Sequence, residues 1–218
     1  MGIRRHHAAP PARKQPLMIQ DMDRILDSLA AKGDLRAIRN SAMLMVGWAG
    51  ALRRSEISGL DVARDQGGNG YIEFSGQGMD IILVRSKTGP RSVAVPLRKR
   101  VPDKCPVRLL QRWLDEAGIG AGPIFRRITP SGILTNDRLG GASISAAVKT
   151  AAKRLGISSA AIGGHSLRAG SVSSAADAGA SLAALQATTG HKQLGTLMGY
   201  IRTRDRFASS ALWALPNW

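Results

Sequence analysis

The chain has 218 residues, and 44% of them are apolar, which is enough for an ordinary globular core. Its 31 Lys and Arg residues stand against 15 Asp and Glu residues, and the net charge of +16 is spread along the chain, which favours a polyanionic partner such as nucleic acid. The single cysteine excludes an internal disulfide framework, and the longest apolar run, residues 42–52, is too short to cross a bilayer.

The N-terminal residues 1–16 are rich in Arg, His, Ala and Pro and show no hydrophobic periodicity. We expect a flexible basic arm or linker there, followed by one domain over residues 17–218. The basic start is followed by Pro and Ala and not by an apolar run, so it does not resemble a secretory signal. Together with the single cysteine, this predicts a cytoplasmic, nucleoid-associated protein without membrane contact.

The next two segments are predicted to be helices. Apolar residues at helical spacing begin near Gln20 and end before Gly33. A second helix over residues 34–50 is almost wholly apolar in its C-terminal half, which is typical of a central helix that is buried on all sides. This helix delivers Arg53 at its end, and a short helix containing Glu56 follows.

Three short runs rich in β-branched and aromatic residues come next, at residues 71–74, 81–84 and 93–95. Gly-rich and Gly-Pro turns separate them, so we expect a small three-stranded antiparallel sheet. The last two runs flank the turn residues 86–91, which puts Lys87 at an exposed hairpin tip. A lone Lys at such a tip usually only protects a sheet edge, and the hairpin itself assigns it no other role.

The C-terminal half of the chain is predicted to consist of helices joined by turns. A helix from Pro106 ends at Gly118, the segment 120–141 is irregular, and a helix follows over residues 144–155. Further helices are expected from near Ser166, from Leu182 to Gly190 and over residues 207–215. The predicted fold class is therefore mainly α with a small three-stranded antiparallel sheet (α+β).

Four separated stretches carry residues that are suited to phosphate chemistry. In chain order they hold Arg53 with Glu56, Lys87, His165 with Arg168, and His191 with Tyr200 nine positions later. His165 and Arg168 are three positions apart at the start of a helix, so they share one face. The N-terminal end of a helix also favours an anion.

Attack on a DNA phosphodiester adds negative charge at phosphorus, and guanidinium groups neutralise it while donating paired hydrogen bonds. Arg53 and Arg168 are our candidates for this task. A phenol has a pKa of about 10 and needs a base, for which neutral His165 is suited, while His191 would donate to the phosphate. Most tyrosines bury the ring and hydrogen-bond the hydroxyl. Tyr200 is a candidate nucleophile only because the chain also carries the Arg, His and Lys residues described above.

The chain is similar to the tyrosine recombinase (phage integrase) family over residues 17–213. The resemblance rests on six residues in chain order: Arg53, Lys87, His165, Arg168, His191 and Tyr200. The resemblance implies the catalytic-domain fold of that family and no metal or cofactor. It also implies that Lys87 protonates the leaving 5′ oxygen and that Glu56 orients an active-site group. One departure from the family pattern is Ala51, since Gly commonly precedes Leu-Arg there.

The resemblance further implies double-stranded DNA as the partner and a homo-tetramer on DNA, formed when the C-terminal helix passes to a neighbouring subunit. The alternative for this helix is packing on its own core. In the family a helical DNA-binding domain precedes a linker such as residues 1–16, and we expect this N-terminal core-binding domain to be absent.

The expected activity is site-specific DNA recombination, in which DNA is cleaved and rejoined through a covalent 3′-phosphotyrosyl intermediate without metal or ATP. Two alternatives stay open: DNA relaxation like that of a type IB topoisomerase, and a non-catalytic DNA-binding accessory protein. His165 favours recombination, because the resemblance implies that such topoisomerases usually lack this histidine. The complete set of six polar residues argues against an accessory protein.

Overall fold

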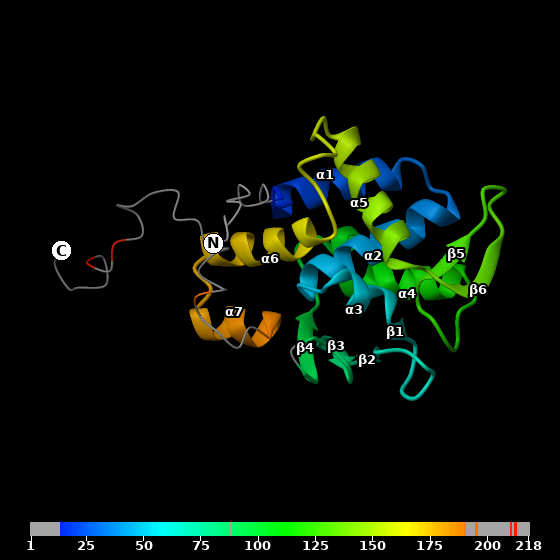
Figure 1. The fold of residues 1–218 in the computed structure, drawn as a ribbon, viewed down its shortest axis with the longest axis horizontal. Helices are drawn as coiled ribbons and strands as arrows, with labels where there is room; N and C mark the ends of the chain where they lie inside the picture. Colours follow the sequence, from blue (N-terminus) through cyan, green and yellow to red (C-terminus); the bar gives the residue numbers. More distant parts are fainter. Residues whose placement is uncertain (1–13, 88, 191–194, 196–209, 211, 213–218) are drawn as a thin grey trace, which may run out of the picture.

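The computed structural model describes residues 14–87, 89–190, 195, 210 and 212 (Figure 1). Within these ranges every helix predicted between residues 20 and 190 is present with similar bounds. The helices are α1 (Ile19–Ala30), α2 (Leu35–Ala49), α3 (Arg54–Ser58), η1 (Pro102–Lys104), α4 (Pro106–Glu116), α5 (Gly141–Arg154), α6 (His165–Asp177) and α7 (Leu182–Thr189). The helix predicted over residues 207–215 falls almost entirely outside the described residues.

Helix α2 lies at the centre of the fold. Its second half is largely buried, as the sequence predicts. Asp34 caps the first turn by accepting a hydrogen bond of 2.6 Å from the Ala37 amide. Helices α1, α4 and α6 contact α2 (Figure 1). Gly47 lets α3 come close as well, since a Cβ there would lie 2.5 Å from a methyl carbon of Ile57. Helix α3 is therefore anchored on the core through Ile57.

Strands β2 (Gly70–Phe74), β3 (Gly78–Leu83) and β4 (Arg91–Pro96) form the predicted antiparallel sheet. A further strand, β1 (Leu60–Asp61), pairs in parallel with β2, so the predicted number of three strands is wrong by one. A strand of two residues is too short to show alternation, and the sequence pattern therefore does not reveal it. Lys87 lies exposed between β3 and β4, where the sequence predicts it.

The segment 120–141, which the sequence predicts to be irregular, contains a second sheet. Here β5 (Arg126–Ile128) pairs antiparallel with β6 (Leu134–Arg138). The prediction is wrong because these strands are mostly polar and show no alternation of apolar and polar residues. Contacts with distant elements hold the hairpin instead, as when Arg138 donates to Asp61 Oδ1 at 2.5 Å.

The leading segment, residues 14–18, runs along helix α6. The Leu17 amide donates to the Ser166 carbonyl at 3.0 Å, and the Leu17 carbonyl accepts from Trp48 Nε1 at 2.9 Å. Gly170 permits this approach, because a Cβ there would lie only 1.6 Å from the Leu17 carbonyl oxygen. Helix α6 is thus covered by the leading segment on one side and contacts α2 on another.

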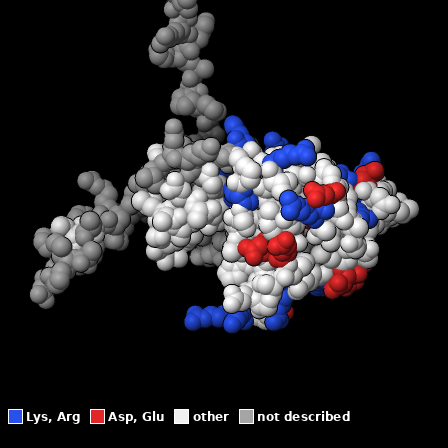
Figure 2. Space-filling model, turned by 90° about the horizontal axis from the view of Figure 1, so that it is seen from below, with Lys and Arg blue, Asp and Glu red and all other residues white. Residues whose placement is uncertain are grey.

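The surface seen from below carries both signs of charge. Figure 2 shows small groups of acidic and basic side chains, some of them adjacent, on a largely uncharged surface. A polyanion that contacts the molecule through this face would therefore meet carboxylates as well as cations. Among the described helices, none combines the length and the apolar character that crossing a membrane requires.

Candidate active site

The turn between α2 and α3 holds Arg53 and Glu56 together. The Arg53 amide donates to Glu56 Oε2 at 2.8 Å, and Arg53 Nη1 donates to Glu56 Oε1 at 2.6 Å. The first bond is half of a capping box, in which an acid in the first helical turn satisfies the amide that precedes the helix. The Glu56 side chain is 2% exposed, whereas that of Arg53 is 23% exposed. A buried carboxylate therefore holds a guanidinium that still reaches solvent.

Helix α6 contributes Arg168, whose side chain is 1% exposed. Its Nη1 donates to the Ala51 carbonyl at 2.5 Å, and its Nη2 donates to the Thr189 carbonyl at 2.6 Å. Ala51 lies two residues before Arg53, and Thr189 ends α7 two residues before His191. One guanidinium therefore joins the α2–α3 turn, α6 and the end of α7.

Ala51 has a backbone conformation that is rare for its residue type. Its φ is +47°, in the left-handed region, which costs an L-residue about 1–2 kcal/mol. Its carbonyl is one of the two acceptors of Arg168. Glycine would adopt this φ without strain.

His165 begins α6 and is exposed to solvent. Its pKa is lowered from the ordinary value of 6.5, first by the partial loss of water around the ring and then by the positive charges of Arg168 and Arg53. The three groups thus lie within electrostatic reach of one another, although they come from two separate elements. The imidazole is neutral at pH 7 and can accept a proton.

We expect the His165 imidazole to titrate below pH 6.5 in the folded chain and to return to its ordinary value in urea. Its folded pKa is below its unfolded pKa, so its contribution to stability is complete above pH 6.5 and is lost as the pH falls through the folded value. NMR titration of histidine-labelled protein measures this pKa, and His165→Gln assigns the signal. A value of 6.5 or higher would contradict the placement of His165 beside two guanidinium groups.

Arg91 belongs to the same cluster, although the sequence prediction gives it no role. It is the first residue of β4; its Nη2 donates to Glu56 Oε2 at 2.9 Å, and its Nη1 donates to the Thr188 carbonyl. These acceptors lie 35 and 97 residues away, so no local motif reveals them. A signal is nevertheless present, because Arg91 has the same strand parity as the buried Val93 and Val95.

Glu56 accepts hydrogen bonds from two arginines and remains ionised. Burial by itself raises the pKa of its carboxyl group. The hydrogen bond from the Arg53 amide, the charge of Arg91 and the side chain of Arg53 outweigh burial, and the pKa is lowered below 4.5. The buried carboxylate is therefore a fixed negative charge between two cations at neutral pH.

Of the three remaining candidates, the structure describes only Lys87. Lys87 is exposed in the β3–β4 turn. His191 and Tyr200 lie outside the described residues. The chain leaves α7 at Gly190, whose left-handed φ of +67° ends the helix. The segment with His191 and Tyr200 therefore follows directly on the α7 carbonyl that Arg168 binds.

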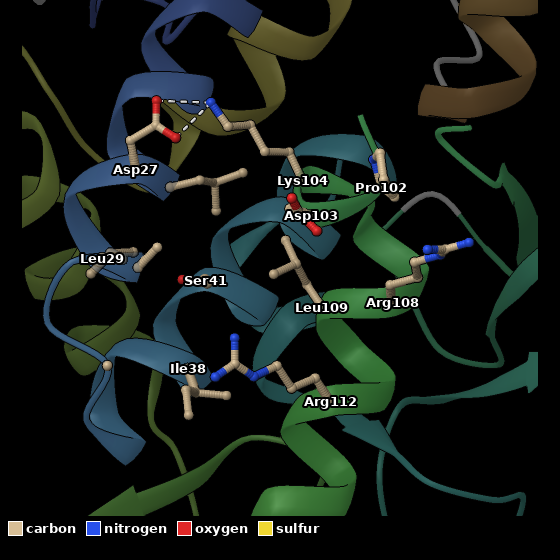
Figure 3. A pocket seen from close by; sticks show the side chains of 13 residues that line it. Asp27, Leu29, Ile38, Ser41, Pro102, Asp103, Lys104, Arg108, Leu109 and Arg112 are labelled. Carbon is tan, nitrogen blue, oxygen red and sulfur yellow. Dashed lines mark hydrogen bonds and ion pairs between the residues drawn. The ribbon is translucent and has the colours of Figure 1, made fainter. Parts of the chain in front are cut away.

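A separate pocket of about 490 Å³ opens between α1, α2, η1 and α4 (Figure 3). Leu29, Ile38 and Leu109 contribute apolar surface to it, and Lys104 and Asp27 form an ion pair of 2.7 Å beside them. None of the described residues predicted for catalysis lines this pocket. The candidate active site is therefore the arginine cluster and not this hollow.

Known proteins share both the sequence pattern and the fold of this chain. Residues 16–206 match the phage integrase family. An integrase/recombinase xerD homolog of Selenomonas ruminantium is 31% identical over 220 residues, which cover 99% of this chain and 62% of that protein. The chain thus spans less than two thirds of the length of this relative.

Two solved structures illustrate the fold. The XerA recombinase superposes with a TM-score of 0.65 at 18% identity and covers 97% of this chain and 68% of its own. The XerH site-specific recombinase, bound to its palindromic difH substrate in a post-cleavage complex, superposes with a TM-score of 0.62 at 16% identity. That match covers 86% of this chain and 49% of the XerH chain. At these identities the likeness shows the fold alone.

Proposed function

The chain belongs to the phage integrase family, and on this basis we propose that it is the catalytic part of a site-specific DNA recombinase. One observation carries the proposal: Arg168 binds the turn that presents Arg53, through the carbonyl of Ala51, which lies 117 residues earlier. Two guanidinium groups from distant segments thus converge beside a neutral imidazole, that of His165. This combination suits a phosphodiester that must be attacked.

In the proposed reaction Arg53 and Arg168 stabilise the negative charge that develops on the nonbridging oxygens of the phosphate. Both guanidinium groups remain charged at any working pH. Arg53 reaches solvent and can donate paired hydrogen bonds to the phosphate, whereas Arg168 is buried on two carbonyls and contributes its positive charge. Glu56 orients Arg53 through the two hydrogen bonds described above. Removing one well-aimed donor of this kind typically costs about 3 kcal/mol of activation free energy.

The proton transfers follow from the remaining candidates. The Tyr200 oxygen attacks phosphorus and gives its proton to His165, while the bond from phosphorus to the 5′ oxygen breaks. Lys87 protonates the departing 5′ oxygen, and His191 donates a hydrogen bond to the phosphate. The lowered pKa of His165 supports its role, because only the neutral imidazole can take the tyrosine proton.

The proposed product is a 3′-phosphotyrosyl bond and a free 5′-hydroxyl. The phosphodiester energy is kept in this covalent bond, so the 5′-hydroxyl of another strand can reverse the step without ATP. Cleavage and rejoining between two duplexes then amount to recombination.

The proposed partner is double-stranded DNA, bound by a homo-tetramer of the protein. The net charge of +16 and the likeness to a XerH complex with its difH substrate support the choice of DNA. In this proposal residues 17–218 form the catalytic domain, residues 1–16 form the linker, and the C-terminal helix reaches a neighbouring subunit.

A strand-joining assay tests the proposed function. The chain is incubated, with EDTA and without ATP, with a pool of nicked duplexes of randomised sequence, and a second strand with a 5′-hydroxyl is then added. We expect DNA joined to the new strand. Relaxation of a supercoiled plasmid of arbitrary sequence without joined products would instead assign a topoisomerase. Salt-sensitive duplex binding without any covalent product would assign an accessory protein.

A further inference from the structure

Arg91 is a buried arginine on a strand face that otherwise carries apolar residues. Its side chain is 8% exposed, and it lies on the inward side of β4, where Val93 and Val95 pack into the core. Its Nη2 binds Glu56 and its Nη1 binds the Thr188 carbonyl, but its Nε is buried and donates no hydrogen bond among the described residues. An apolar residue would fill this position without an unpaired donor.

The charge of Arg91 is held in place by one carboxylate. Burial lowers its pKa, and the charge of Glu56 together with the hydrogen bond to it counteracts this effect. The same Glu56 oxygen, Oε2, also accepts from the Arg53 amide at 2.8 Å. A movement of Arg91 would therefore shift the Glu56 carboxylate and, with it, the position of Arg53.

Two arginines bind the end of α7. Arg91 donates to the Thr188 carbonyl, and Arg168 donates to the next carbonyl, that of Thr189. The last carbonyls of a helix lack partners within the helix and carry partial negative charge, so cations are favourable there. The chain therefore leaves α7 at Gly190 from a point that a strand residue and a helix residue hold together.

We propose that Arg91 is a positioning residue for DNA strand cleavage, which holds Glu56, and through it Arg53, in register with the end of α7 and with the hairpin that carries Lys87. The inference rests on the proposed function. Arg91 does not contact the phosphate; it acts through Glu56 and through the backbone of α7. Misplacing a catalytic group by about 1 Å can cost up to about 100-fold in rate, so the expected loss on removing Arg91 is about 10- to 100-fold.

The test compares Arg91→Met, Arg91→Lys, Glu56→Gln and the double variant Arg91→Met/Glu56→Gln in single-turnover cleavage of a nicked duplex at saturating DNA. We expect Arg91→Met to bind DNA like the wild type and to cleave about 10- to 100-fold more slowly. The double variant should be no slower than the slower single variant, because both changes break one linkage. Arg91→Lys should lie between wild type and Arg91→Met, since it keeps the charge near Glu56 but cannot serve both acceptors.

Arg98→Met is the matched control. Arg98 follows β4 and forms a bidentate pair with Asp23, at 2.7 and 3.0 Å, away from Glu56. We expect it to lower the melting temperature and to leave the cleavage rate unchanged. The conservative variant separates positioning from packing, because Arg91→Lys restores a cation beside Glu56 and should recover part of the cleavage rate, which a role in apolar packing alone would not produce.

If the wild type cleaves DNA, three results would overturn the inference about Arg91. These are a wild-type rate in folded Arg91→Met, rate losses that multiply in the double variant, and a wild-type rate in Arg91→Lys when Arg91→Met does not fold. Absence of cleavage by the wild type itself would instead refute the proposed function, so the two failures are distinguishable.

Discussion

Arg168→Lys is expected to slow strand cleavage by about 10²- to 10³-fold. Lysine keeps the positive charge, but its ammonium group cannot reproduce the planar pair of donors. In the folded chain Arg168 binds the carbonyls of Ala51 and Thr189 with one guanidinium. Lysine leaves at least one of these acceptors without its donor, so Arg53 and the end of α7 lose a common anchor.

The measurement is the single-turnover rate of covalent complex formation at saturating nicked duplex, with thermal melting followed by circular dichroism. The unsatisfied carbonyl is expected to cost about 1–3 kcal/mol of unfolding free energy, so the rate is measured well below the melting temperature. Arg154→Lys is the matched control, because Arg154 is an exposed arginine in the last turn of α5. If Arg168→Lys cleaved as fast as Arg154→Lys, the assigned role of Arg168 would be wrong.

Helix positions could be predicted because local signals mark both ends. Asp34 accepts the capping hydrogen bond before α2, and Gly190 ends α7 in the left-handed conformation. The apolar run within α2 likewise indicates its buried place at the centre of the core. Each of these signals lies within a few residues of the feature that it predicts.

The small strands could not be predicted, because their stability comes from distant partners. Strand β1 has only two residues and depends on its pairing with β2. Strands β5 and β6 are polar, and Arg138 holds the second of them through Asp61, which lies 77 residues away. No periodicity within these segments reports such contacts.

In the site, too, the residues that local motifs mark could be predicted, and the contacts between distant segments could not. The motifs identify Arg53, Glu56, His165 and Arg168 by residue type and order, and the described structure brings these four near one another. The burial of Arg168 was not predicted, because the sequence places this residue at the N-terminus of a helix, an end that favours a bound anion. It results from the packing of α2 and residues 14–18 around α6.

Tyr200→Phe is expected to abolish the covalent complex and to leave duplex binding intact. Phenylalanine keeps the ring and lacks the oxygen that attacks phosphorus, so no phosphotyrosyl bond can form. Tyr71→Phe is the matched control, because the chain has only two tyrosines and Tyr71 lies in β2. We expect the Tyr71 variant to cleave at the wild-type rate.

The central claim is that one tyrosine carries the cleaved DNA, and the linkage itself can be identified. End-labelled nicked duplex is incubated with the wild-type chain, the adduct is isolated under denaturing conditions and digested with protease, and the modified peptide is sequenced by mass spectrometry. We expect a 3′ phosphate of DNA bonded to the Tyr200 oxygen and a free 5′-hydroxyl on the released strand. An adduct on another residue, a phosphate left on the 5′ end, or the same adduct from Tyr200→Phe would contradict the claim.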